Sequence, residues 1–147
     1  MCHNEQSVKS VLSELTGLSK DKPLIIIFGS SIGKKVGTIF SIMEQYSEHI
    51  KKVYCLQNEE HPRLQTIEQI MKAFKDYSEE MGGSRLTLDH LDQTQDRGNN
   101  VRDTIEEVVA TCGPNVNILI CGSFYFMADA KRAIEKIQQE LLMSEEE

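Results

Sequence analysis

The sequence lacks the features that mark membrane and secreted proteins. Its longest apolar runs are only a few residues, far short of the ~20 needed to cross a bilayer. The N-terminus has no basic segment followed by an apolar one, so no signal peptide is indicated. We therefore expect no membrane association and a cytoplasmic protein.

The cysteines lack the spacing of a metal site. None of the four stands in a CxxC pair or at a zinc-type distance from a histidine, so we predict no metal centre. Cys55 and Cys121 lie in apolar runs that read as strands. We expect them to be buried free thiols of a reducing compartment.

Basic clusters and catalytic pairs are also missing. With a net charge of −7 and scattered Lys and Arg, the chain has no footprint for nucleic acid. Glu79-Glu80 and Glu106-Glu107 lie on helices whose apolar stripes point elsewhere, so we interpret them as solvated faces. His49 and His90 have no partner pattern and are expected to be exposed or to cap. No catalytic residue is predicted within this chain.

The apolar spacing predicts one domain, residues 1–147, in which helices alternate with short strands. The expected helices are 8–18, 36–50, 67–80 after a Thr66 cap, 101–112 and 128–142. The expected strands are 24–28, 53–56, 86–88 and 116–121, with a polar loop at 89–100 and a solvated tail at 144–147. This alternation is typical of right-handed βαβ units, so the fold class is α/β, a three-layer Rossmann-like domain with a mainly parallel sheet.

The last strand ends in Gly122-Ser123 and leads into a helix. Such a junction exposes backbone N–H groups and a hydroxyl at the carboxyl edge of the sheet, where open α/β folds bind ligands. Ser123 has no G-x-S-x-G context and no evident His partner, so a nucleophile role is not predicted. We expect substrate to bind at this edge.

Two further loops belong to the same predicted edge. Gly29 to Lys35 is no Walker A loop, because three residues separate its glycines and Lys35 stands where Ser or Thr would hold magnesium. Ser30, Ser31 and Lys34 are available to touch a phosphate or carboxylate, the alternative being an ordinary tight turn. Arg63, after His61-Pro62, either contacts a carboxylate or phosphate bidentately or is a surface residue beside a turn proline.

Three segments, in order, resemble one known family. Cys2-His3-Asn4-Glu5 resembles the second half of an Asp-Gly-x-His-Asn-Pro motif, and Ile118 to Phe124 resembles Val-Leu-Val-Cys-Gly-Ser-Phe. Between them, Pro62-Arg63 followed by Thr66-Ile-Glu-Gln69 resembles a Pro-Arg pair that precedes a helix rich in Glu and Gln. The chain therefore resembles, over nearly its whole length, the C-terminal domain of the folylpolyglutamate synthase and dihydrofolate synthase family, in the Mur ligase superfamily. Glu5 in place of Pro, and Gly33-Lys34-Lys35 in place of an Asp-Lys-Asp-like sequence, depart from the family pattern.

The resemblance implies part of an ATP-dependent amide ligase that joins glutamate to folate or pteroate through an acyl phosphate. It implies that His3 and Asn4 face the nucleotide, that Ser123 and the N–H groups around Gly122 hold glutamate, and that Arg63 assists. ATP and Mg²⁺ would be bound with an N-terminal ATP-binding domain that has no counterpart in this chain. Met1 stands where the family has Gly, which indicates a start inside the motif. The domain alone is expected to be folded but inactive.

Two other hypotheses stay open. One is a stand-alone Rossmann-like module that binds a nucleotide or an acidic metabolite. The other is a receiver-like or scaffold domain without a small-molecule site. Against a receiver, the first strand ends in Phe28-Gly-Ser and not in the acidic residue that phosphorylation requires.

Overall fold

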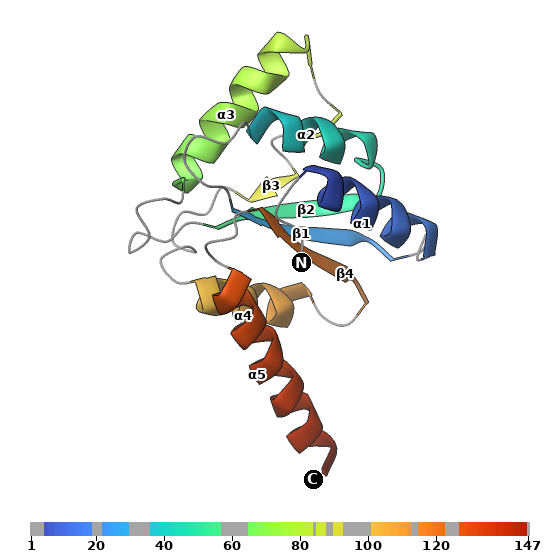
Figure 1. Ribbon diagram of the computed structural model, residues 1–147, viewed down its shortest axis with the longest axis vertical. Helices are drawn as coiled ribbons and strands as arrows, with labels where there is room; N and C mark the ends of the chain where they lie inside the picture. The colour runs from blue at the N-terminus through green and yellow to red at the C-terminus, as the bar shows by residue number, and fades with distance from the viewer. Residues whose placement is uncertain are drawn as a thin grey trace.

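The computed structural model describes residues 5–18, 22–29, 36–56, 65–83, 85–87, 90–92, 101–112, 115–122 and 127–146. In this part, helices and strands alternate along the chain. The elements are α1 (Glu5–Leu18), β1 (Leu24–Gly29), α2 (Val36–Gln45), β2 (Ile50–Cys55), α3 (Ile67–Glu80), β3 (Leu91–Asp92), α4 (Val101–Cys112), β4 (Asn117–Gly122) and α5 (Met127–Glu146). Figure 1 shows the sheet between two helical layers, with α1, α2 and α3 on one face and α4 and α5 on the other. The predicted three-layer α/β fold is confirmed.

The sheet has the strand order β3-β2-β1-β4, and every neighbouring pair is parallel. β1 and β4 pair without a shift from Leu24–Asn117 to Gly29–Gly122. Between β1 and β2 the register shifts once, because Leu24 pairs with Ile50 while Ile25 pairs with Lys52. Lys51 is therefore an extra residue at the start of β2, as in a β-bulge.

The central strand β1 is apolar along its length because both of its faces are covered. All six of its residues are buried. Ile26 and Phe28 pack in the core beneath α1, α2 and α3, while Ile25 and Ile27 pack in the core beneath α4 and α5. Each such side chain contributes roughly 1.5–3 kcal/mol through burial. The prediction of a strand buried on both faces is confirmed.

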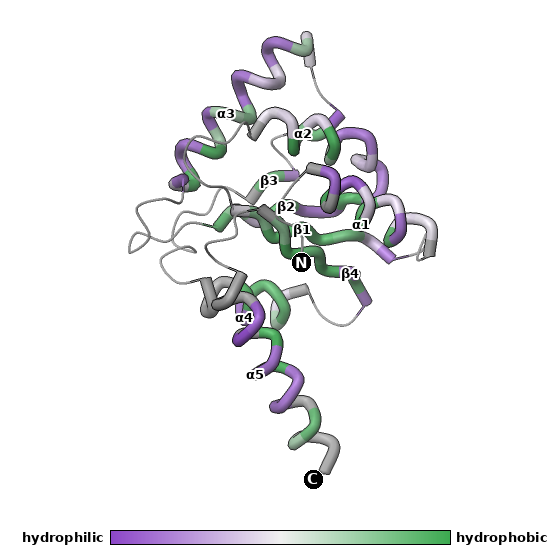
Figure 2. The backbone as a smooth tube through the Cα atoms, viewed as in Figure 1, coloured by the Kyte–Doolittle hydropathy of each residue, from purple (hydrophilic) through white to green (hydrophobic). Residues whose placement is uncertain are grey.

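An aromatic cluster fills the core beneath the first helical layer. The rings of Phe40 on α2 and Phe74 on α3 meet edge to face with centroids 5.1 Å apart, and Phe28 lies 5.9 Å from Phe40. Val8 and Leu12 of α1 are fully buried in the same core. Figure 2 shows that apolar colour follows the strands and the inward sides of these helices. The apolar stripes read from the sequence therefore face the sheet.

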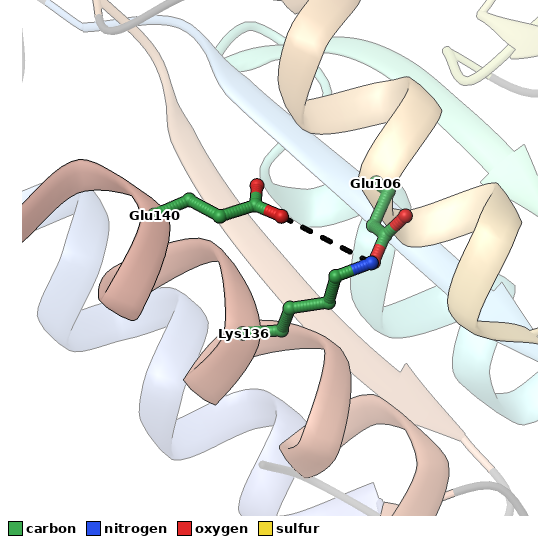
Figure 3. A network of polar contacts seen from close by, with 3 residues as sticks. All are labelled: Glu106, Lys136 and Glu140. Carbon is green, nitrogen blue, oxygen red and sulfur yellow. Dashed lines mark ion pairs between the residues drawn. The ribbon is translucent and has the colours of Figure 1, made fainter. Parts of the chain in front are cut away.

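The second layer consists of α4 and α5. Ile105 and Val108 of α4 are fully buried, and Ile134 and Ile137 of α5 pack against the same cluster. At the surface between the two helices, Lys136 Nζ lies 3.3 Å from Glu106 Oε1 and 3.9 Å from Glu140 Oε1 (Figure 3). The predicted solvated face thus includes an ion pair at Glu106.

The boundary between α2 and β2 differs from the prediction. The helix ends at Gln45, five residues before the predicted end at Ile50, and Ile50 begins β2. The amides of Tyr46 and His49 donate to carbonyls three residues back, at 3.0 and 2.9 Å, so tight turns replace the helix. Ile50 fits the spacing of a helical stripe, but its buried side chain belongs to the strand.

Two further segments correct the sequence interpretation. Strand β3 is Leu91–Asp92, within the predicted loop, whereas Leu86 and Thr87 of the predicted strand 86–88 belong to no strand. Leu86 is fully buried although it lies in a bend, so its apolar character reflects packing and not a strand. At the C-terminus, α5 continues to Glu146, so the predicted tail at 144–147 is wrong for residues 144–146.

Local hydrogen bonds fix both ends of α3. At the start, Thr66 Oγ1 accepts the Gln69 amide at 3.1 Å, and Gln69 Oε1 accepts the Thr66 amide at 2.9 Å, which forms a capping box. At the end, the amides of Gly82 and Gly83 donate to the carbonyls of Glu79 and Ser78. This is a Schellman motif, with φ of +70° at Gly82. The predicted Thr66 cap is confirmed.

His90 closes a short turn before β3. Its ring Nδ1 accepts the backbone amide of Thr87 at 3.0 Å, and its own carbonyl accepts the amide of Val53 at 2.7 Å. The ring therefore caps a local backbone group, one of the two roles expected for it. His49 is half-buried, and its carbonyl accepts the Leu24 amide at 2.8 Å.

Candidate functional site

The strand order places a topological switch point between β1 and β4. From β1 the chain passes to α2 on one face of the sheet, whereas from β4 it passes to α5 on the opposite face (Figure 1). When two neighbouring parallel strands lead to helices on opposite faces of the sheet, a crevice forms between the two loops. Ligands of open α/β sheets bind in this crevice. The carboxyl ends of β1 and β4 are therefore the candidate functional site.

Two glycines form the rim of this site. Gly29 ends β1, Gly122 ends β4, and the two are paired in the ladder. Since neither residue has a side chain, a ligand could approach their backbone closely. One position back, Phe28 pairs with Cys121, and the Phe28 carbonyl accepts the Leu56 amide at 2.7 Å. The rim therefore rests on buried, hydrogen-bonded strands.

Of the residues predicted from sequence to bind ligand, the structure describes Gly122. It places Gly122 at the switch point, beside Gly29. Ser30 and Ser123 directly follow these two glycines in the sequence. Ser30 and Ser123 themselves lie outside the described residues. So do the remaining predicted site residues, which are His3, Asn4, Ser31, Lys34 and Arg63.

Asp92 is a residue at this edge that the sequence interpretation missed. It ends β3 and pairs with Tyr54 of β2, close to the carboxyl end of that strand. The segment was expected to be a polar loop, because a strand of two residues has too little apolar pattern to be seen. Aspartate is depleted in strands, so the residue after Leu91 gave no signal for this one.

α3 begins after a capping residue, Thr66, and this cap bears on whether the helix start can bind an anion. In the capping box, the side chains of Thr66 and Gln69 each accept a hydrogen bond from the backbone amide of the other residue. A helix N-terminus binds anions through free N–H groups, and here the Gln69 amide is taken by Thr66. At least one backbone N–H group at the start of α3 therefore already has a hydrogen-bond acceptor within the chain.

Tyr77 is a titratable group with a perturbed pKa, and it lies on α3 and not on the strand ends that form the rim. Burial, and then the hydrogen bond to Glu44, raise the pKa of Tyr77 above its ordinary value. This tyrosine belongs to α3, and its partner Glu44 belongs to α2. Its ring lies 6.4 Å from Phe40, so we assign the pair to helix packing and not to chemistry.

The described residues also bear on metal and membrane binding. Within them, no three His, Cys, Asp or Glu side chains come together as a group that could hold a metal ion. None of the helices in that part is both long enough and apolar enough to cross a bilayer. Cys55 and Cys121 are buried and neither forms a disulfide bond, as predicted.

Comparison with known proteins identifies the fold. No protein-family model and no curated protein matches the sequence. Among solved structures, Escherichia coli FolC in complex with ADP, without folate substrate, superimposes on 95% of this chain with a TM-score of 0.63 and 17% identity. FolC with DHPP and ADP gives a TM-score of 0.63 and 16% identity over 94% of the chain.

A third similar structure comes from another organism. Mycobacterium tuberculosis folylpolyglutamate synthase complexed with ADP matches 90% of the chain with a TM-score of 0.59 and 22% identity. In each of these three comparisons the chain spans 28% of the length of the other protein. The resemblance seen in the sequence is thus confirmed at the level of the fold: this chain has the Rossmann-like fold of a segment of the FolC and folylpolyglutamate synthase chains.

Proposed function

We propose that this chain is the C-terminal domain of a cytoplasmic, ATP-dependent ligase that adds glutamate to folate or dihydropteroate. The observation that carries the proposal is the similarity in fold, over 95% of the chain, to FolC in complex with ADP. The sequence motifs at residues 2–5, 62–69 and 118–124 support it independently, since they resemble the same family in the same order.

The proposed reaction has two steps. A carboxylate oxygen of the folate or pteroate substrate attacks the γ-phosphorus of ATP, which forms an acyl phosphate and releases ADP. The amine of glutamate then attacks the acyl carbon, phosphate leaves, and an amide bond forms. Both steps depend on positioning and charge neutralisation, so they need no nucleophile from this chain.

In this proposal the rim of the switch point receives glutamate. The backbone N–H groups around Gly122 and the hydroxyl of Ser123 donate hydrogen bonds to a glutamate carboxylate, and Arg63 offers a bidentate contact. The pairing of Gly122 with Gly29 supports this role, because it keeps the rim free of side chains at both strand ends. Ser30, Ser31 and Lys34, in the loop after Gly29, are the proposed contacts for a phosphate or a second carboxylate.

The nucleotide and metal are assigned mainly to a partner domain. His3 and Asn4 are proposed to contact the nucleotide, while an ATP-binding domain preceding this one in the parent protein holds ATP and Mg²⁺. Closure of the two domains would complete the site and exclude water. Residues 1–147, taken as one domain, are therefore proposed to be inactive alone.

The test is an ATP-dependent phosphate-release assay with glutamate and either dihydropteroate or tetrahydrofolate. It is run on the 147-residue chain and on the longer polypeptide that carries the preceding domain. We expect turnover by the longer polypeptide and none by the chain alone. Turnover by the short chain, or by neither, would overturn the proposal.

The alternative is a stand-alone module that binds a small molecule. It draws on one observation, that the switch point at Gly29 and Gly122 lies within this chain. Titration calorimetry of the short chain with ATP, ADP and glutamate separates the two ideas. Tight binding, combined with no phosphate release by the longer polypeptide, would favour the module.

A further inference from the structure

We draw no further inference here: the strongest candidate, the exposed apolar surface at Leu142 and Met143 near the end of α5, is a helix face for which nothing in the described part of the structure shows what covers it.

Discussion

The hydroxyl of Tyr77 on α3 donates a hydrogen bond to Oε2 of Glu44 on α2, with the two oxygens 2.5 Å apart. The second oxygen of the same carboxylate, Oε1, accepts the backbone amide of Arg85 at 3.1 Å. One acidic side chain therefore connects α2 to α3 and to the segment that follows the Schellman turn. No local pattern indicates this connection, because Tyr77 and Glu44 are 33 positions apart.

Removing the Tyr77 hydroxyl should measurably weaken the fold. We expect Tyr77→Phe to lower the free energy of unfolding by about 1–2 kcal/mol, because a hydrogen bond to a charged acceptor is lost while the ring remains. Urea unfolding measures the change. Tyr46→Phe is the matched control, since Tyr46 is also half-buried and no hydrogen bond of its hydroxyl is seen within the described residues. Equal losses in the two variants would contradict the assignment.

The same hydrogen bond should make stability depend on alkaline pH. Burial and the Glu44 hydrogen bond raise the pKa of Tyr77 above 10.0, while a hydrogen bond with Ser41 lowers it. The folded state then holds this proton more tightly than the unfolded state. The contribution to stability is complete below the unfolded pKa and is lost as the pH rises through the folded pKa.

The measurement compares urea midpoints of the wild type and Tyr77→Phe at about pH 9 and about pH 11. We expect the advantage of the wild type to shrink at the higher pH, because the other tyrosines titrate equally in both proteins. An advantage that stays constant across this range would show that ionisation of Tyr77 does not affect folding.

The end of α3 should depend on glycine at position 82. Gly82 has φ of +70°, where an added Cβ is strained even though it would meet no atom within 4 Å. We expect Gly82→Ala to destabilise the protein by about 1 kcal/mol. Gly17→Ala is the control: Gly17 also has open space around it, but it lies in α1 without a positive φ. Thermal unfolding should show that variant to be neutral or slightly stabilised.

The ion pair between α4 and α5 should contribute little. The side chains of Lys136 and Glu106 are 43% and 31% exposed, so water screens their attraction. We expect Lys136→Met to change the free energy of unfolding by less than about 0.5 kcal/mol, since Met retains the apolar stem. Lys131→Met, an exposed lysine of the same helix, is the comparison. A loss above about 1.5 kcal/mol for Lys136 alone would mean that the pair is important to packing.

The proposed glutamate site predicts a selective effect of Ser123→Ala in the longer polypeptide that we propose to be active. Loss of a hydrogen bond to a carboxylate, worth about 1.5–3 kcal/mol, should raise the KM for glutamate by roughly 10- to 150-fold. The KM for ATP and the melting temperature should stay the same. Ser13→Ala, on the exposed face of α1, should leave all three unchanged. An unchanged KM for glutamate in Ser123→Ala would remove Ser123 from the site.

The sequence predicts best where local pattern and tertiary packing agree. The run from Leu24 to Phe28 is apolar at every position because two cores claim alternate residues, so the strand was recognisable without its neighbours. The limits of α4 were also predicted as the structure has them, at Val101 and Cys112. In both segments the sequence pattern fits one type of secondary structure only.

Prediction failed where an apolar residue satisfies two patterns. Ile50 continues the helical spacing of α2, yet it pairs with Leu24 in the sheet. Leu86 reads as a strand residue, yet it is buried from a bend. The secondary structure at such a residue depends on its tertiary contacts, which cannot be predicted from the local sequence pattern.

The candidate site was predicted only in part. The sequence predicted that a strand ends at the Gly122-Ser123 junction, and β4 does end at Gly122; that a ligand binds there stays a prediction. The neighbour of that strand was not predictable, because strand order depends on which face each crossover helix covers. Only the structure shows that Gly29, and no residue of β2, stands beside Gly122.

Phe28 stands between two thiols, since it pairs with Cys55 on one side and with Cys121 on the other. The two cysteines are therefore two strand spacings apart, roughly 9–10 Å. A disulfide needs Cα atoms within about 7 Å, so the pair cannot be oxidised to a bridge while the sheet is intact. An internal Cys55–Cys121 crosslink, if ever found by mass spectrometry, would thus report molecules that had first lost β1 from the middle of the sheet.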